Sequence, residues 1–166
     1  MAYTTLAAVH LELGIATATT ADDSLLSVYI PQAQQAIDTH TSRMFEAASD
    51  TTRYRDAIAD VRGNVLDLGG DLCAITSVTN GDDVLVAATE YVTEPRNKTP
   101  YYALTLLSSK GKVWTYNTDP ENAIKVIGKW AYSATCPTDV ARACTRLVGY
   151  WYRLKDSQVF DVTANP

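Results

Sequence analysis

The hydrophobic period of this chain changes twice, and these changes constrain its fold more than any other feature. Up to about residue 45, apolar residues recur every three or four positions, as on one face of an amphipathic helix. From Val65 the period becomes two, which is typical of half-buried strands, and after Pro137 the helical period returns. The pattern predicts an α+β fold: a mainly helical bundle with a small antiparallel β subdomain inserted into it.

Two helices are expected before the strands. Thr4 or Thr5 can cap a short first helix, and Gly14 supplies the left-handed residue that ends it. Pro31 lies inside the second helix, so we expect a kink near Ser27 or a helix that restarts there. The apolar stripe of this second helix consists of Leu26, Ile30, Ala33, Ile37 and Met44.

Alternating segments between residues 65 and 132 predict the strands. Asn80-Gly81 is typical of a type I′ hairpin turn, because both residues tolerate positive φ. Gly128 lies in the last expected strand, where it indicates a bulge or a close approach of another backbone. Before the turn, Leu66 and Leu68 alternate with Asp67, and Ile75 and Val78 lie in a strand rich in β-branched residues. After the turn, we expect further short strands at Val84 to Val86, Tyr91 to Thr93, Tyr101 to Leu107, Lys112 to Tyr116 and Ile124 to Tyr132.

The last helix carries the sharpest local pattern. Its expected apolar seam is Val140, Cys144, Leu147, Trp151 and Leu154. On another side, Arg142, Arg146 and Arg153 follow one another at spacings of four and seven, so they share one face. Two interpretations stay open: a solvated face opposite the core, or a surface that pairs with carboxylates on a partner or a neighbouring subunit.

Composition limits the classes of function. The 166 residues are 46% hydrophobic and 20% charged, as in an ordinary globular chain, and the net charge of −5 gives no general attraction to nucleic-acid phosphates. No apolar run approaches the roughly 20 residues that cross a bilayer. The first residues lack the pattern of a signal peptide. We therefore expect synthesis in a cytoplasm and no membrane association.

No motif for catalysis, metal binding or a cofactor is present. His10 and His40 lie far apart and outside any zinc-binding frame, and we expect them at the surface or its boundary. Cys73, Cys136 and Cys144 form no C-x-x-C pair, so we expect small, reduced, buried thiols. Phosphate loops and nucleophile elbows are also missing. We predict no catalytic residue, no cofactor and no metal site.

Aromatic residues gather on the expected strands and on the last helix. Alternate rings on a sheet can stack nucleic-acid bases, but few arginines or lysines lie between these rings. Core packing and protein interfaces are the better interpretation. The residues concerned are Tyr101, Tyr102, Trp114, Tyr116, Trp130, Tyr132, Tyr150, Trp151 and Tyr152.

Several short segments, taken in order, resemble the head–tail connector (adaptor, or head-completion) proteins of tailed bacteriophages. Serine at 42 and alanine at 131 stand where that family usually has glycine. The segments are Thr41 to Phe45, Thr52 to Arg55, the set Ile75, Val78 and Gly81, the pair Glu90-Tyr91, the strand Val126 to Tyr132, and the set Pro137, Val140 and Ala143.

The resemblance implies a structural virion protein rather than an enzyme. Such proteins form a ring beneath the portal protein, usually twelve-fold, which extends the DNA channel and offers a docking surface for a stopper or tail-completion protein. The implied partners are the portal, the stopper and further copies of the chain, while DNA passes without specific binding. The implied location is the neck of the virion, after synthesis in the host bacterial cytoplasm. The isolated chain can be a monomer if the portal is needed as a template.

Under this interpretation the chain is a single connector domain with four parts. Residues 1–64 hold the N-terminal helices and an arm, residues 65–134 the β subdomain, residues 135–155 the C-terminal helix, and residues 156–166 a flexible tail. Arg142, Arg146 and Arg153 are the candidate protein interface. Three alternatives remain: a stopper or tail-completion protein, a small α+β enzyme with a tyrosine-lined pocket, and a nucleic-acid-binding module.

Overall fold

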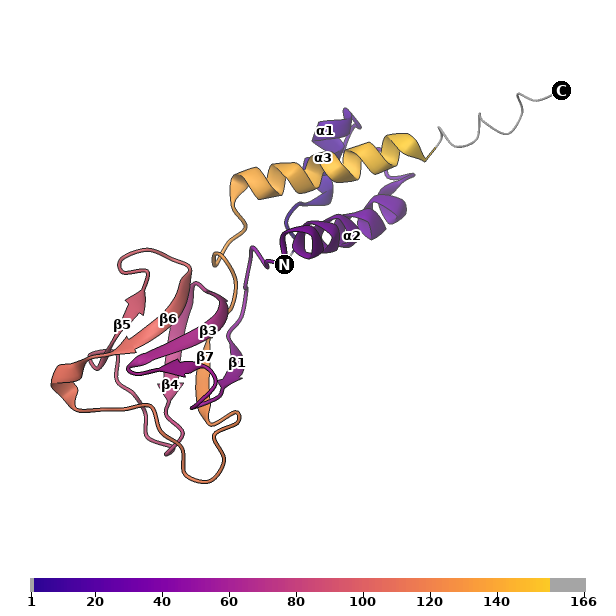
Figure 1. Ribbon diagram of the computed structural model, residues 1–166. Coiled ribbons are helices and arrows are strands. Elements are labelled where there is room, and N and C mark those ends of the chain that lie inside the picture. Colours follow the sequence, from indigo (N-terminus) through magenta and orange to yellow (C-terminus); the bar gives the residue numbers. More distant parts are fainter. Residues whose placement is uncertain (1, 156–166) are drawn as a thin grey trace. The chain divides into compact units, whose positions relative to one another are not determined.

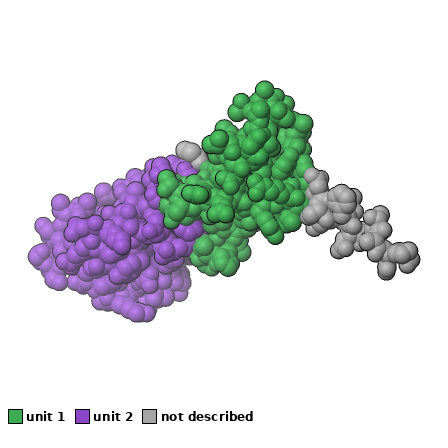
Figure 2. Space-filling view, turned by 90° about the horizontal axis from the view of Figure 1, so that it is seen from above, with its two compact units in different colours: residues 1–42, 136–166 green, residues 43–135 purple. Residues whose placement is uncertain are grey.

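The computed structural model describes residues 2–155 and forms two compact units. Residues 1–42 and 136–166 belong to the first unit, and residues 43–135 form the second, which is thus inserted between the two halves of the first (Figures 1 and 2). The expected flexible tail, residues 156–166, lies outside the described residues.

The fold is α+β, with three α-helices in the first unit and two small antiparallel sheets in the second. Helix and strand hold similar shares of the described residues, so the expectation of a mainly helical chain was wrong. The reason is that strands begin before Val65: β1 (Thr51–Arg55) and β2 (Val61–Arg62) occupy the segment that the sequence suggested was an arm.

The first two helices begin and end largely where their capping residues predict. Helix α1 (Leu6–Leu13) begins after Thr5, whose hydroxyl accepts a hydrogen bond from the Ala8 amide at 3.2 Å, and ends at Gly14 with φ of 70°. Helix α2 (Asp23–Thr41) is continuous through Pro31, so the helix does not restart there. It ends at Ser42, which takes a left-handed conformation, and Met44 therefore lies outside the helix.

Helix α3 (Thr138–Leu154) packs against both α1 and α2 within the first unit. Pro137 occupies the cap position, one residue before the helix. Of the expected seam, Cys144 is fully buried but Leu154 is exposed. The buried line is instead shifted around the helix, because two neighbouring helices cover it, and comprises Cys144, Thr145, Val148 and Gly149.

The second unit contains two antiparallel sheets that enclose one core. The three-stranded sheet has the order β1-β7-β4, and the four-stranded sheet has the order β2-β3-β6-β5. Besides β1 and β2, the strands are β3 (Val65–Leu72), β4 (Ala74–Thr79), β5 (Tyr91–Glu94), β6 (Tyr101–Leu106) and β7 (Ile124–Lys129). Side chains from both sheets fill the core, including Leu66, Leu68, Leu72, Val78, Leu104, Leu106, Ile124 and Val126. Expected strand regions at 65–79, 91–93, 101–107 and 124–132 are thus confirmed in outline.

Other expectations about the strands were wrong. Residues 84–86 and 112–116 form only isolated bridges, Thr79 with Leu85 and Gly81 with Tyr116, and a short 3₁₀ helix, η1 (Ser108–Lys110), precedes the second segment. The chain does reverse after β4, but positive φ occurs at Asp83 and not at Asn80 or Gly81, so the turn is not type I′.

Close backbone approach explains two glycines of the second unit. A Cβ on Gly81 would lie 2.3 Å from the Thr115 carbonyl oxygen. At Gly128 a Cβ would lie 2.2 Å from the carbonyl oxygen of Ala74 on the paired strand β4, and the ladder between these strands shifts register beside it. Both positions therefore require glycine for space, as expected for Gly128.

Candidate interaction surfaces

The predicted arginine row lies on the solvent-exposed side of α3. Arg142, Arg146 and Arg153 are all exposed, while Cys144 and Val148 on another side of the helix are fully buried. None of the three guanidinium groups makes an ion pair or a side-chain hydrogen bond with any residue between 2 and 155. The row therefore presents three cations that the described part of the chain leaves available to a partner.

Interhelical contacts fix the orientation of this row. The ring of Trp151 meets Tyr29 of α2 edge-on, with centroids 6.2 Å apart, and the hydroxyls of Thr4 and Thr145 lie 2.6 Å apart in a buried pair. Such packing locks the rotation of α3 against α1 and α2, since turning the helix would break both contacts. The arginines thus project from a rigid element.

At its end, α3 is joined to the start of α2 by a small polar cluster. The Tyr152 hydroxyl donates to Asp22 Oδ2 at 2.6 Å, and Lys155 Nζ lies 3.1 Å from Asp22 Oδ1. These hydrogen bonds, first from Tyr152 and then from Lys155, hold the pKa of Asp22 below its usual range. The hydrogen bond to Asp22 in turn raises the pKa of both Tyr152 and Lys155.

Aromatic side chains divide between core and surface. Trp114 and Trp130 are buried, and their indole N–H groups donate to the carbonyl oxygens of Asn64 and Thr51 at 2.9 and 3.1 Å. Their core role is confirmed. By contrast Tyr102 and Tyr150 are 58% and 59% exposed, so their rings are open to a partner.

Three arginines of the second unit contact carboxylates, a backbone carbonyl or aromatic rings. Arg43 Nε lies 3.2 Å from Asp71 Oδ2, and its guanidinium carbon lies 5.6 Å from the Tyr132 ring centroid. The Arg53 guanidinium stacks 4.5 Å above the Trp130 ring, and burial lowers the pKa of Arg53. Arg55 donates to the Leu68 carbonyl oxygen. These contacts hold β1, and the segment that precedes it, against the rest of the unit.

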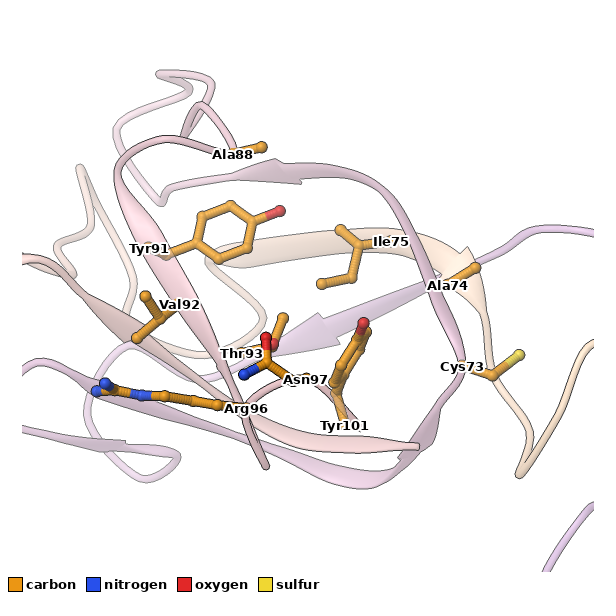
Figure 3. Close-up of a pocket in the computed structure, with 10 residues that line it drawn as sticks. All are labelled: Cys73, Ala74, Ile75, Ala88, Tyr91, Val92, Thr93, Arg96, Asn97 and Tyr101. Carbon is orange, nitrogen blue, oxygen red and sulfur yellow. The ribbon is translucent and has the colours of Figure 1, made fainter. Parts of the chain in front are cut away.

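A cavity of about 560 Å³ opens in the second unit. In Figure 3, Tyr91 and Ile75 lie side by side, Asn97 and Tyr101 lie below this pair, and Arg96 and Cys73 lie at opposite ends of the cavity. Arg96 is the one charged side chain among the ten that line it; its side chain is 67% exposed, with Nε 3.7 Å from Glu94 Oε1. The volume and the mostly apolar lining are typical of a binding pocket.

The chemistry of this cavity suits binding rather than proton transfer. Burial, followed by the nearby Tyr101, raises the pKa of Tyr91. Burial also raises the pKa of the Cys73 thiol. Both groups are therefore neutral at pH 7, so the phenol is a poor base and the thiol a poor nucleophile.

The residues considered for metal binding are placed apart. Within residues 2–155, no three His, Cys, Asp or Glu side chains come together as a metal site, and no helix is long and apolar enough to span a bilayer. His10 was expected near the surface, but it is 4% exposed, and its Nε2 lies 2.7 Å from Asp23 Oδ1. It joins the end of α1 to the start of α2.

The sequence did not indicate the cavity. Its walls come from β4, β5, β6, the loop between the last two, Cys73 just before β4 and Ala88 before β5, and these segments meet only through the folding of the whole unit. The one local signal was the pair of prolines at 95 and 100, which bound that loop and follow cis peptide bonds.

No protein-family model matches the chain, and no curated protein matches it either. Two solved structures share its fold. A chain in the neck of a native gene transfer agent (GTA) particle, computed with C12 symmetry, has a TM-score of 0.56 and 16% identity, over 90% of this chain and 76% of that chain. A chain in the virion of a native GTA particle has a TM-score of 0.55 and 20% identity, over 89% and 76%. The likeness therefore establishes a common fold, and it extends over both the helices and the inserted sheets.

Proposed function

We propose that this chain is a structural protein of the neck of a tailed-phage-like particle: an adaptor that forms a twelve-fold ring under the portal. The observation that carries the proposal is the fold shared over 90% of the chain with a chain of a GTA neck computed with C12 symmetry. The order of motifs from Thr41 to Ala143, which resembles head–tail connectors, supports the same role independently.

A ring role agrees with the surfaces of the two units. In a ring, each copy contacts its two neighbours through two different surfaces. When the ring closes, neither of these contact surfaces stays exposed on any copy. The row on α3 offers cations, and the second unit offers exposed apolar side chains such as Ile58, Leu85 and Val113. Charge and apolar area on separate surfaces suit such unlike contacts.

We assign Arg142, Arg146 and Arg153 to the contact with the portal or with an adjacent subunit. Guanidinium groups on a rigid helix can form bidentate pairs with carboxylates, and they lose little freedom when they do so. The net charge of −5 fits a channel through which DNA moves without sticking.

Charge reversal tests this assignment. The variant Arg142→Glu, Arg146→Glu and Arg153→Glu is expected to fold, because all three side chains are exposed. It should lose attachment to purified capsids that carry a portal, measured by co-sedimentation. The control Arg62→Glu, Lys98→Glu and Lys110→Glu changes the net charge equally at exposed sites of the second unit. Equal attachment of both variants would reject the role of the row.

A stopper or tail-completion protein of the same neck is the second candidate. It would bind the adaptor or the tail rather than the portal. Pull-down of the full chain on isolated portal and on isolated tail tube separates the two roles: binding to portal supports the adaptor, and binding only to the tail side supports the stopper.

For the enzyme alternative, the chain has a pocket, but the titratable groups that line it do not have the pKa values that acid–base catalysis needs. Tyr91 and Tyr101 do line a cavity, as a tyrosine-lined pocket would require. However, an acid–base site needs groups with pKa values near neutrality, whereas burial raises the pKa of both Tyr91 and Cys73 above their usual values.

A further inference from the structure

A hollow of about 220 Å³ lies in the second unit, where the chain reverses after β4. Side-chain hydrogen bonds of Asn80 with the backbone of Val113 and Thr115 join the two segments that form it. The Asn117 amide also donates to the Gly81 carbonyl oxygen at 3.1 Å. The volume lies below the roughly 300–1,000 Å³ of ligand pockets, so the hollow suits one inserted side chain rather than a small molecule.

Apolar side chains surround this hollow at the surface. Val84 and Val113 line it, and Leu85 and Tyr116 belong to the same two segments. All four side chains are 40% or more exposed. Apolar side chains that gather in this way on a surface are typical of a contact with another protein.

The unpaired charges at the hollow are acidic. Asp82 lines it and Asp83 follows, and neither carboxylate forms an ion pair with any residue between 2 and 155. Lys112 also lines the hollow, but its Nζ lies 2.9 Å from Glu90 Oε2. The hydrogen bond from Lys112, and more weakly the charge of Lys110, lower the pKa of Glu90, so both lysines already interact with an acid of the same unit. A fitting partner brings one large side chain with cations beside it.

The exposed side of α3 carries this combination. Tyr150 lies four residues after Arg146 and three before Arg153, and Arg142 precedes Arg146 by four, so the four side chains share one face, called here the α3 face. The Tyr150 ring is exposed, and the three guanidinium groups have no carboxylate partner in the described part of the chain. Tyrosine and arginine are among the residues that most often anchor protein interfaces by filling pockets on the partner.

We infer that the α3 face of one copy docks on the hollow of the next copy in the ring. Tyr150 enters the hollow, and Arg146 and Arg153, which lie on either side of it along the helix, pair with Asp82 and Asp83. This inference rests on the proposed function and names the surface that the arginine row contacts. It also gives each copy the two different surfaces that a closed ring requires.

The wall of the hollow can satisfy the groups that this contact buries. The Tyr150 ring lies against Val84 and Val113, and its hydroxyl can donate to Asp82 or Thr115. Guanidinium groups pair with carboxylates in bidentate geometry, and their planar shape limits the freedom that is lost. Each surface therefore supplies what the other lacks.

Photo-crosslinking between full-length chains tests the inference. The donor carries p-benzoylphenylalanine in place of Tyr150, and the acceptor is an isotope-labelled chain without the probe. The reaction is run on purified chains at high concentration and on both chains added to portal-bearing capsids. We expect adducts on acceptor residues 82–86 and 111–116, located by mass spectrometry. The matched control carries the probe in place of Tyr102, which is equally exposed but lies on β6, and should give no adduct on these residues.

Three results would overturn the inference: adducts only elsewhere on the acceptor, adducts only on the portal, or no adduct in either preparation. In a second arm, the donor also carries Arg146→Glu and Arg153→Glu. Like charges then meet at the hollow, and we expect the yield to fall about tenfold. An acceptor with Asp82→Lys and Asp83→Asn should restore it; asparagine suits the positive φ at residue 83.

The control acceptor carries Glu12→Lys and Asp67→Asn. These substitutions make the same change of charge at exposed positions outside the lining of the hollow, so they should not restore the yield. Equal recovery with both acceptors would show that only the net charge matters and would reject the pairing with Asp82 and Asp83.

Crosslinking of purified chains is scored without capsids, so its result can be separated from that of the neck role. Attachment to portal-bearing capsids without the expected adduct would reject this contact alone. The adduct without any attachment would support self-association through the hollow while rejecting the neck role.

Discussion

Tyr152 and Asp22 are joined by a hydrogen bond of 2.6 Å that connects the last turn of α3 to the residue before α2. Lys155 binds the second oxygen of the same carboxylate at 3.1 Å. Since α3 carries the arginine row, this cluster helps to hold the row in position. Its ionisation should therefore affect the stability of the first unit.

The stabilisation from Asp22 should disappear in acid. Its pKa is lowered in the folded chain from 3.8, so its contribution is present above that value and is lost as the pH falls through the lowered folded pKa. The pKa values of Tyr152 and Lys155 are raised from 10.0 and 10.5, so their contributions hold below those values and are lost as the pH rises through the folded values. Asp22→Asn should thus lower Tm between about pH 5 and pH 9, and this effect should shrink steadily as the pH falls below 3.8.

Thermal unfolding followed by helical circular dichroism would measure this difference. Glu12→Gln is the matched control, because it removes a carboxylate from an exposed position in the same unit. An Asp22→Asn effect of the same size at every pH would show that ionisation of Asp22 is not involved.

Two glycine-to-alanine substitutions should have opposite effects. Gly128→Ala places a Cβ 2.2 Å from the Ala74 carbonyl oxygen, so β4 and β7 must separate, and we expect a loss of about 1–3 kcal/mol or more. Gly149→Ala places a Cβ 3.6 Å from Leu13 Cδ2, an ordinary contact, inside a helix. Alanine there should stabilise by about 0.5–1 kcal/mol. Urea unfolding measures both, and the same sign for the two variants would contradict the backbone geometry described here.

Asn80 should be hard to replace, because its side chain joins two segments that do not form a strand pair. The buried amide donates from Nδ2 to the Val113 carbonyl oxygen at 3.0 Å and accepts from the Thr115 amide at 3.1 Å. Asn80→Ala leaves both backbone groups without these partners, which should cost about 2 kcal/mol or more. Asn80→Asp keeps the acceptor but loses the donor, so urea unfolding should give an intermediate loss. If both variants are as stable as the parent, Asn80 does not hold this loop.

The three cysteines should differ in reactivity. Cys144 is fully buried, and burial raises its pKa to about 11, whereas Cys73 and Cys136 are partly exposed. Only thiolate reacts with disulfide reagents. In the folded chain at about pH 8, an Ellman titration should show two accessible thiols, with the third released by urea. Rapid reaction of all three would contradict the packing of α3 against α1 and α2.

Local sequence patterns predicted where the helices and strands lie better than they predicted how these elements contact one another. Thr5, Gly14 and the alternation around Leu66 and Leu68 depend on neighbouring residues, and the structure confirms the elements that they indicate. The type I′ turn failed because the side chain of Asn80 serves a long-range contact with residues 113 and 115, which no local rule contains. The seam of α3 shifted because two helices cover it.

The candidate sites show the same division. Helical spacing alone places Arg142, Arg146 and Arg153 on one exposed side, and the structure agrees. The cavity between β4 and β5 depends on which strands end each sheet, and that follows from pairing across the whole second unit. Its lining residues, such as Ile75 and Tyr101, appear in the sequence only as ordinary strand residues.

Cryo-electron microscopy of portal-bearing capsids incubated with the purified chain tests the neck role most directly. The account predicts a ring of density beneath the portal, with twelve copies of the two units and the arginine row at a contact with the portal or a neighbouring copy. Capsids whose portal vertex stays bare at saturating concentrations of the chain would contradict it.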